Sequence, residues 1–282
     1  MTLFLRWRAL GVASMAALSL LATACSSTDD TATPTAEGTD EEAAPAATEE
    51  AAEASEADEH PAWGYTAEDG PDRWGEDYPT CGTGIEQSPI DLTGATEEDI
   101  ADIAFAYGQT PLEIFNNGHT IEVEPAEAMS IELNGTTYDV AQFHFHAGSE
   151  HQVDGQQFPM EMHIVHTAGN ALAVVGVMIQ EGAENAALAP VFDNIPTAVS
   201  EEAQAVEGQV VDLDAILPST RTYYQYSGSL TTPPCSEDVA WQVLDTPIEV
   251  SAEQLAAFTA VVNGNFRPVQ PLGERILIDD AA

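Results

Sequence analysis

The chain has 282 residues, and 48 Asp and Glu residues against six basic residues give it a formal net charge of −42. All six basic residues are Arg, and the lack of clustered Lys and Arg argues against a nucleic-acid partner and against electrostatic docking on anionic lipid. The chain still has 4 Trp, 7 Tyr and 9 Phe, and 44% of its residues are hydrophobic. We therefore expect a folded acidic domain joined to an acidic disordered segment.

The first residues are typical of an export signal. Arg6 and Arg8 precede an uncharged, mostly apolar stretch over 9–24, which is short for a membrane span. The run Leu21-Ala22-Thr23-Ala24-Cys25 resembles the lipobox of bacterial lipoproteins, in which the new N-terminal Cys carries the lipid. We therefore expect a signal peptide over 1–24 and a lipid on Cys25, which would be the only membrane contact. Ordinary cleavage that leaves Cys25 as a thiol is the alternative.

Residues 25–59 have the composition of a linker. After Cys25 they are almost entirely Ala, Glu, Asp, Ser, Thr and Pro, with 12 acidic residues and no basic or aromatic residue. Repulsion between the carboxylates and the lack of large apolar side chains predict an extended, disordered segment. An Ala/Glu helix is the alternative, which the Pro residues disfavour. The remaining residues, 60–282, are predicted to form one domain.

Short alternating runs broken by Gly, Pro and Asn predict that this domain is mainly β. Residues 120–124 alternate apolar and polar side chains, and 130–133 do so again before Asn134-Gly135, a strong hairpin signal. The continuous apolar run over 171–179 has the length of a buried central strand. A helix is expected over 251–262, with a Ser as its N-cap and Glu and Gln in its first turn.

Five of the seven His residues lie within 144–166. The run Gln-Phe-His-Phe-His over 142–146 alternates perfectly, so that on a strand both imidazoles point to one face and both Phe rings to the other. After a turn near Asp154-Gly155, residues 159–166 alternate again. If these two strands are neighbours in a sheet, imidazoles from both would converge on one point.

His144, His146 and His163 are the three that would converge. Three neutral imidazoles without a thiolate suit a Zn²⁺ ion that keeps its fourth position open for water. Gln142 and Glu161 each stand two residues before one of these His residues, on the same face, where they could accept a hydrogen bond from the ring and orient it. A His cluster that only stabilises the fold, or a structural zinc, is the alternative.

The remaining cysteines are Cys81 and Cys235. If Cys25 carries a lipid, an exported domain would hold these two as a pair, which favours a disulfide. The bond would close a loop of about 154 residues and stabilise the domain by roughly 4–5 kcal/mol on the chain-entropy account.

Several further motifs extend in a consistent order from about residue 62 to residue 278. They are Trp63-Gly64-Tyr65, Gln87-Ser88-Pro89-Ile90, Asn116-Asn117-Gly118-His119, Gln142-Phe143-His144-Phe145-His146, Gly148-Ser149-Glu150-His151, Glu161-Met162-His163-Ile164-Val165-His166, Ser229-Leu230-Thr231-Thr232-Pro233-Pro234, Trp241 and Asn265-Phe266-Arg267-Pro268. Together they resemble the α-class carbonic anhydrases. The pair Cys81 and Cys235 stands where secreted bacterial members carry their disulfide.

The resemblance implies a mainly β (α+β) single domain on a large, mostly antiparallel, twisted ten-stranded sheet with peripheral helices. It implies a Zn²⁺ cofactor and reversible hydration of CO₂ to bicarbonate and a proton, by attack of zinc-bound hydroxide with a His proton shuttle. It also implies inhibition by sulfonamides and anions, and it leaves oligomerisation open.

The resemblance also assigns roles outside the three zinc ligands. His119 matches the proton shuttle, Thr231 the gatekeeper hydroxyl, and Glu150 the carboxylate that orients Thr231. Asn265, like Gln142 and Glu161, matches a residue that supports a zinc ligand. The positions that match the substrate pocket are Val165, Val174, Leu230, Thr232, Val239 and Trp241, and those that match the polar wall along the proton path are Tyr65 and Asn117. The alternative for the apolar positions is that they only pack the core. The alternative for Thr231 and His119 is that they are only turn residues.

One position departs from the family pattern. Glu122 stands where well-studied members often have Asn, and a carboxylate close to His119 would raise the pKa of its imidazole. His151 and His166 match structural positions and are expected to donate to buried backbone or carboxylate groups rather than to bind metal. Arg267 is expected to make a structural ion pair.

Two other functions have less support in the sequence than catalysis. A binding or adhesion module on the same fold would have lost at least one zinc ligand, and all three are present. A zinc hydrolase of another class lacks support because the chain contains no H-E-x-x-H motif.

The acidity of the domain is interpreted as an adaptation to high salt, in which counterions screen the repulsion between surface carboxylates. The melting temperature is then expected to rise steeply between dilute buffer and about 1 M NaCl, as circular dichroism would show. A melting temperature that does not change with salt would contradict the interpretation. The expected location is outside the cytoplasm, either lipid-anchored at the cell envelope or secreted.

Overall fold

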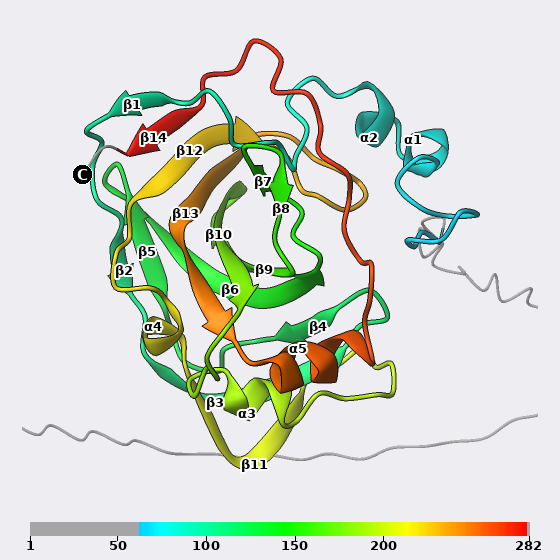
Figure 1. The fold of residues 1–282 in the computed structure, drawn as a ribbon, viewed down its shortest axis with the longest axis vertical. Helices are drawn as coiled ribbons and strands as arrows, with labels where there is room; N and C mark the ends of the chain where they lie inside the picture. Colours follow the sequence, from blue (N-terminus) through cyan, green and yellow to red (C-terminus); the bar gives the residue numbers. More distant parts are fainter. Residues whose placement is uncertain (1–61, 281–282) are drawn as a thin grey trace, which may run out of the picture. The chain divides into compact units, whose positions relative to one another are not determined.

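The computed structural model describes residues 62–280, and the predicted signal peptide, the lipidated Cys25 and the predicted linker lie outside the described residues. Within 62–280, no helix is long and apolar enough to cross a membrane. These residues form one domain made mostly of strands, with short helices beside a large sheet (Figure 1). The predicted mainly β, single-domain fold is therefore confirmed.

The strands are β1 (Thr96–Glu98), β2 (Ala104–Ala106), β3 (Gln109–Asn116), β4 (Ile121–Val123), β5 (Ser130–Leu133), β6 (Thr136–Ala147), β7 (Gln152–Val153), β8 (Gln156–Gln157), β9 (Met160–Ala168), β10 (Ala171–Glu181), β11 (Gln204–Asp212), β12 (Tyr223–Gly228), β13 (Val239–Val250) and β14 (Ile278–Asp280). The helices are α1 (Trp74–Asp77), α2 (Pro79–Thr83), α3 (Ala189–Phe192), α4 (Leu213–Ile216) and α5 (Ala252–Thr259).

Twelve of the strands form one sheet, and ten of these follow one another in the order β1-β14-β12-β13-β10-β9-β6-β4-β3-β11. Strand β5 joins this path at β6, and β2 pairs with β5. Among the pairs in residues 62–280, β1–β14 and β10–β13 are parallel and the others are antiparallel. The large, mostly antiparallel sheet is thus confirmed; its central path has the expected ten strands, and β2 and β5 add two beside β6.

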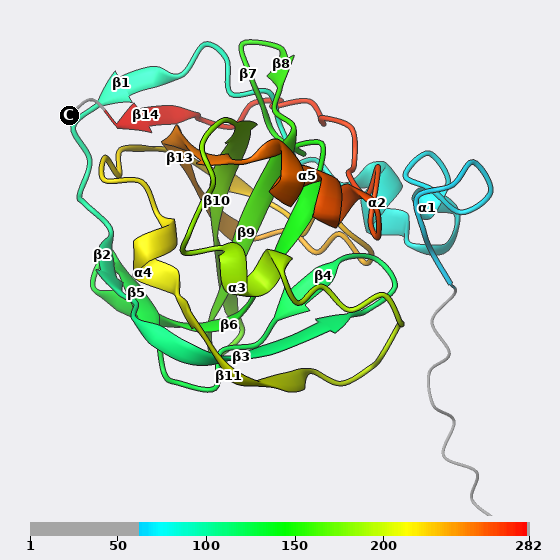
Figure 2. The ribbon, with the colours of Figure 1, turned by 60° about the horizontal axis from the view of Figure 1, so that its bottom comes forward.

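Strand β6 separates an apolar face from a polar face, as its alternating sequence predicted. Phe145 is fully buried in the main core, where Phe192 of α3 and Phe258 of α5 lie 5.7 and 5.9 Å from it between ring centroids. The two helices lie next to each other over this core (Figure 2). His144 and His146 point to the opposite face, because successive side chains on a strand alternate.

Strand β10 is the buried central strand predicted from its apolar run. Val175 and Val177 belong to the main core, while Val174 and Met178 belong to a second apolar cluster on the other face. Both faces of β10 are therefore covered, which explains why its sequence is apolar throughout rather than alternating. Burial of each such side chain contributes about 1.5–3 kcal/mol to folding.

The two predicted tight turns have the backbone conformation that their residues favour. Asn134 and Gly135, between β5 and β6, have φ values of 51° and 79°, and Asp154 and Gly155, between β7 and β8, have 50° and 76°. Positive φ at both central positions is the geometry of a type I′ hairpin turn, which Asn-Gly and Asp-Gly tolerate best. The first turn sets the register of β5 against β6, the strand that carries two of the clustered His residues.

Helix α5 begins where the capping signal placed it. The Ser251 side chain accepts from the backbone N–H of Gln254 at 3.2 Å, and the Gln254 side chain accepts from the backbone N–H of Ser251 at 3.1 Å. The helix ends at Thr259, three residues before the predicted end at Val262, because the chain then turns back toward β6. The backbone N–H of Gly264 donates to the last residue of β6 at 2.9 Å.

Candidate active site

The three His residues predicted to converge do so on one face of the sheet. His144 of β6 lies directly opposite His163 of β9 in the antiparallel pair, and His146 follows on the same face of β6. One ring nitrogen from each lies within 4.8 Å of the other two. His146 and His163 are buried and His144 is partly exposed, so the cluster is open on one side.

Each of these rings is held from behind by an oxygen atom. Gln142 Oε1 lies 2.7 Å from His144 Nδ1, and Glu161 Oε1 lies 2.9 Å from His163 Nε2. The carbonyl oxygen of Asn265, rather than its side chain, lies 2.7 Å from His146 Nδ1. The other nitrogen of each ring therefore points into the cluster, and among these His146 Nε2 is buried without a hydrogen-bond partner.

This donor set fits a metal ion. Burial lowers the pKa of all three imidazoles, well below the usual range for His144 and to about 4 for His146, so the rings are neutral and can donate lone pairs. A buried nitrogen with no partner is costly unless something binds it. Three imidazoles with one open side are the donor set of a catalytic zinc site.

Glu161 anchors this cluster from within the fold. Its Oε2 accepts the backbone N–H groups of Glu150 and His151 at 2.8 and 2.9 Å, and its Oε1 lies 2.7 Å from His151 Nδ1 as well as beside His163. Burial alone would raise the pKa of Glu161, but His151 and His163 hold it well below its usual range. The other nitrogen of His151 bonds the Tyr226 hydroxyl at 2.6 Å, so both its ring nitrogens are occupied and neither is left for a metal.

Gly176, inside the apolar run of β10, makes room for this carboxylate. It lies opposite His163 in the β9–β10 pair. A Cβ atom at this position would come within 3.0 Å of Glu161 Oε1 and within 3.3 Å of a Val243 methyl group. The absence of a side chain thus allows a carboxylate to lie between two buried strands.

A second carboxylate, Glu150, is buried next to the inward-facing nitrogens of His146 and His163. Burial raises its pKa to about 7, while His163, a hydrogen bond from the Thr231 side chain and the backbone N–H of Arg267 oppose the rise. Its Oε2 lies 3.5 Å from His146 Nε2. The structure therefore brings Thr231 and Glu150 together next to the three imidazoles.

A cavity of about 110 Å³ opens in front of His144 and His146. Its other lining residues are Trp63, Tyr65, Asn117, His119, Thr120, Glu122, Gln142 and Thr232. This cavity is not chosen for its volume. A hollow of about 850 Å³ elsewhere on the domain is larger, but no His lines it. The convergent imidazoles make the smaller cavity the candidate site.

His119 lies on the wall of this cavity, stacked on Trp63. The ring centroids are 3.8 Å apart and the rings are inclined by 9°. The side chain of Asn117 accepts the backbone N–H groups of His119 and Thr120 at 2.9 and 2.8 Å, which holds the turn that carries His119. Asn117 therefore has a structural task besides its place in the polar wall.

The expected effect of Glu122 on His119 is wrong. Burial lowers the pKa of His119, and the carboxylate that opposes this change is Asp69 rather than Glu122. Glu122 instead accepts from the Asn117 side chain at 2.9 Å. Asp69 was missed because it precedes His119 by 50 positions; its carboxylate accepts from the backbone N–H and hydroxyl of Thr66 at 3.0 and 2.7 Å.

The apolar residues predicted to line the pocket form one cluster beside the His residues. Val174, Val239 and Trp241 are buried there, with Val165 and Leu230 partly buried against them. The Trp241 ring lies 4.9 Å from the His163 ring.

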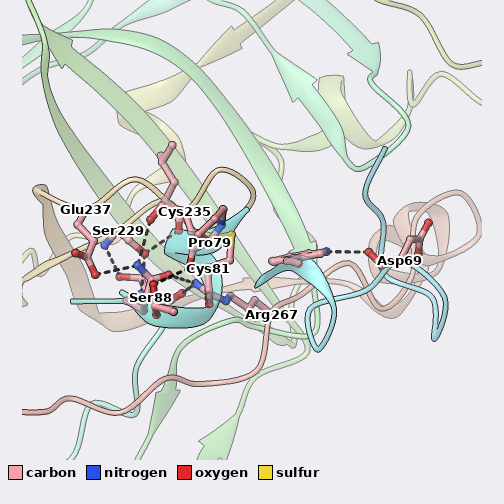
Figure 3. The surroundings of a disulfide bond; sticks show 12 residues. Asp69, Pro79, Cys81, Ser88, Ser229, Cys235, Glu237 and Arg267 are labelled. Atoms are coloured by element: carbon pink, nitrogen blue, oxygen red, sulfur yellow. Dashed lines mark hydrogen bonds between the residues drawn. A yellow bond between two sulfur atoms is a disulfide. The ribbon is translucent and has the colours of Figure 1, made fainter. Parts of the chain in front are cut away.

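Arg267 does not make the expected ion pair. Its guanidinium donates to three neutral oxygens, those of Gln87 Oε1, Ser88 O and Cys81 O, at 2.9, 2.8 and 2.8 Å (Figure 3). Because these acceptors satisfy the buried guanidinium, a carboxylate partner is not needed there, and Glu150 bonds the backbone N–H of Arg267 instead. His166 donates to the backbone as expected, with Nδ1 3.3 Å from Ala173 O.

Cys81 and Cys235 form the expected disulfide. The bond joins α2 to the loop that follows Thr231, and the Gln87 side chain donates to Cys235 O at 3.1 Å in the same region (Figure 3). Segments 154 residues apart are therefore fixed to each other, and Trp63 and Tyr65, which line the cavity, pack against the buried cluster that contains both Cys residues.

Comparison with known proteins identifies the family of the chain. A family model described as eukaryotic-type carbonic anhydrase matches residues 69–280. A carbonic anhydrase of Pectobacterium carotovorum is 43% identical over 221 residues, covering 77% of this chain and 90% of that protein. Carbonic anhydrase 7 of Homo sapiens is 33% identical over 257 residues, covering 77% of this chain and 97% of that protein.

The fold is also similar to solved structures. The α-carbonic anhydrase of Thermovibrio ammonificans, in complex with the inhibitor sulfanilamide, has a TM-score of 0.73 and 40% identity and covers 77% of this chain and 98% of its own. The Photobacterium profundum α-carbonic anhydrase has a TM-score of 0.73 and 37% identity and covers 77% of this chain and 100% of its own. The chain therefore belongs to the α-carbonic anhydrase family of enzymes.

Proposed function

We propose that the chain hydrates CO₂ reversibly to bicarbonate and a proton, with Zn²⁺ held by His144, His146 and His163. The observation that carries the proposal is the convergence of one unengaged nitrogen from each ring, while the other nitrogen is fixed by an oxygen atom. When bound, Zn²⁺ supplies Lewis acidity, which allows water to act as a nucleophile near neutral pH.

Thr231 and Glu150 would control which ligands fit beside the three imidazoles. The Thr231 side chain lies close enough to Glu150 to lower the pKa of that carboxyl, and because a carboxylate can only accept, the Thr231 hydroxyl would be the donor between them. The lone pairs of the hydroxyl would then be left to accept a hydrogen bond from a group held at the three imidazoles. A reacting group that carries a proton can donate to Thr231 and is oriented, whereas an anion without a proton is disfavoured.

The apolar cluster beside the imidazoles suits CO₂, which has no charge and little ability to hydrogen-bond. Val174, Val239 and Trp241 offer no side-chain charge, and the Trp241 N–H is already used, since it donates to Ser229 O at 2.9 Å. Sulfonamides are expected to inhibit the enzyme, because a related carbonic anhydrase is described in complex with sulfanilamide.

His119 would carry the product proton away from the cavity. Its side chain is half-buried at the wall, where a neutral imidazole can accept a proton from water inside and release it to buffer outside. Stacking on Trp63 supports this role by holding the ring at the rim.

Stopped-flow CO₂ hydration tests the proposal. The wild-type protein should contain one Zn²⁺ per chain and lose its rate on chelation, and added Zn²⁺ should restore it. His144→Ala should lose both metal and rate, because two imidazoles hold zinc far more weakly than three. His166→Gln removes an imidazole that bonds Ala173 O and the Tyr107 hydroxyl and does not line the cavity, and it should keep both metal and rate. A wild-type protein without a chelator-sensitive rate would overturn the proposal.

We also propose that this chemistry takes place outside the cytoplasm, with the domain either anchored through Cys25 or secreted. The disulfide between Cys81 and Cys235 supports this location, because such bonds persist in oxidising compartments. Recovery of the native protein in the cytosolic fraction would contradict it.

A further inference from the structure

Glu122 lies directly beside the proposed metal site, although neither the imidazole cluster nor the proton path uses it. It is the partner of His144 in the antiparallel β4–β6 pair, and His144 is in turn the partner of His163. Directly opposed residues on neighbouring strands share one face, with Cβ atoms about 4.5–5.5 Å apart. The Glu122 carboxylate therefore stands on the same face as the three imidazoles, one strand away from His144.

The carboxylate is fixed at the wall of the cavity. Glu122 lines the cavity with His144 and His146, and its Oε2 accepts from the Asn117 side chain at 2.9 Å. The ten lining residues, all within 62–280, include no Arg and no other carboxylate. An anion that enters would thus meet an acidic side chain and no basic one to offset it.

We propose that Glu122 is a specificity residue that weakens the binding of small monovalent anions such as chloride in the cavity, while leaving the approach of neutral CO₂ unaffected. A charge on the low-dielectric wall of a cleft acts strongly on ions inside it and not on an uncharged molecule. The inference deepens the proposed function, on which it rests, because an anion in the cavity would compete for the open position on the metal. Weaker binding of chloride suits a domain whose acidic composition is interpreted as an adaptation to high salt.

A purely structural role is the competing explanation. Glu122 accepts from Asn117, and Asn117 holds the turn that carries His119. The two explanations make different predictions for Glu122→Gln, because Gln keeps the shape and the acceptor oxygen but removes the charge. Glu122→Asp keeps the charge and shortens the side chain.

The experiment uses the holoenzyme and its cobalt-substituted form at about pH 8, well above the ordinary pKa of a carboxyl group, because burial raises the pKa of Glu122. Chloride is titrated at constant ionic strength set with sulfate, and its dissociation constant is obtained from the visible absorption of Co²⁺. Inhibition of CO₂ hydration by chloride gives the second measurement.

Glu122→Gln should bind chloride on the order of tenfold more tightly than wild type, the effect of a unit charge within about 7 Å at an effective dielectric constant of about 40. Glu122→Asp should stay within about twofold of wild type. Glu124→Gln is the matched control, since it makes the same charge change on an exposed neighbour that does not line the cavity, and should also stay within about twofold.

The outcomes separate this inference from the proposed function. Equal chloride affinity in Glu122→Gln and wild type, with chelator-sensitive hydration present, overturns the inference alone. Tighter chloride binding in Glu122→Asp as well as in Glu122→Gln also overturns it, because the charge would then not be the cause. A wild-type protein that binds neither Zn²⁺ nor Co²⁺ overturns both.

Discussion

Replacing Glu161 with Ala should lower the melting temperature by about 6–20 °C and weaken zinc binding by about 10–100-fold. The carboxylate is fully buried and accepts from two backbone N–H groups and two imidazoles. Its removal leaves these donors without a partner, which costs about 3–5 kcal/mol for a broken buried charge network. Zinc binding weakens because His163 loses the oxygen atom that orients it.

Thermal unfolding of the metal-free and zinc-loaded proteins separates the two effects. Glu161→Gln keeps one acceptor oxygen but turns an NH₂ group toward a donor. Its melting temperature and its zinc affinity should therefore lie between those of the wild type and Glu161→Ala. Glu132→Ala removes an exposed carboxylate from β5 and should leave the melting temperature within about 1 °C, as surface changes usually do. An unchanged melting temperature in Glu161→Ala would show that the network adds no net stability.

Replacing His119 with Ala should lower kcat at low buffer concentration by about 100-fold, while kcat/KM for CO₂ stays near the wild-type value. In the proposed reaction the proton is removed in a step separate from the attack on CO₂, so its transfer would limit turnover but not the capture of CO₂. Imidazole added as a buffer should restore most of kcat, because it can accept the proton in place of the missing side chain. A parallel loss of kcat and kcat/KM, without rescue by imidazole, would contradict the shuttle.

The pH dependence of this step gives a second test of the site. Burial lowers the pKa of His119, and the Asp69 carboxylate raises it by favouring the imidazolium. Asp69→Asn should therefore lower the pKa of His119 further, and the pH profile of kcat should move to lower pH. NMR titration of His119 measures the pKa directly. Asp72 is an exposed acid in the same loop, and Asp72→Asn should change the pKa of His119 less. A higher pKa of His119 in Asp69→Asn would contradict the role given to Asp69.

The parts of the site that follow from local periodicity were predictable from the sequence. Alternation over residues 142–146 and 159–166 was enough to place three imidazoles on one face, because side-chain direction on a strand depends only on position along the strand. The same alternation placed Gln142 and Glu161 beside His144 and His163, where the structure has them. The Asn134-Gly135 turn was predictable for a similar reason, since its backbone preference is local.

The parts that depend on distant segments were not predictable. Arg267 donates to residues near position 85, and an Arg buried among neutral carbonyls has the same sequence pattern as one in an ion pair. His146 is held by the backbone carbonyl of Asn265, an atom that every residue type carries. The place of Glu122 beside His144 depends on the register of β4 against β6, which the sequence does not specify.

Strand β14 (Ile278–Asp280) has a consequence for how the chain folds. It lies between β1 and β12, and its pairing joins Thr96 to Ile278, which are 182 positions apart. Contacts between residues this distant in the chain form slowly. Until residue 280 has been synthesised, the edges of β1 and β12 stay open to pairing with other molecules. Mutual repulsion between such highly acidic, incomplete chains would keep them apart during that interval. The charge that surrounds the finished enzyme would thus also protect it from aggregation before its sheet is complete.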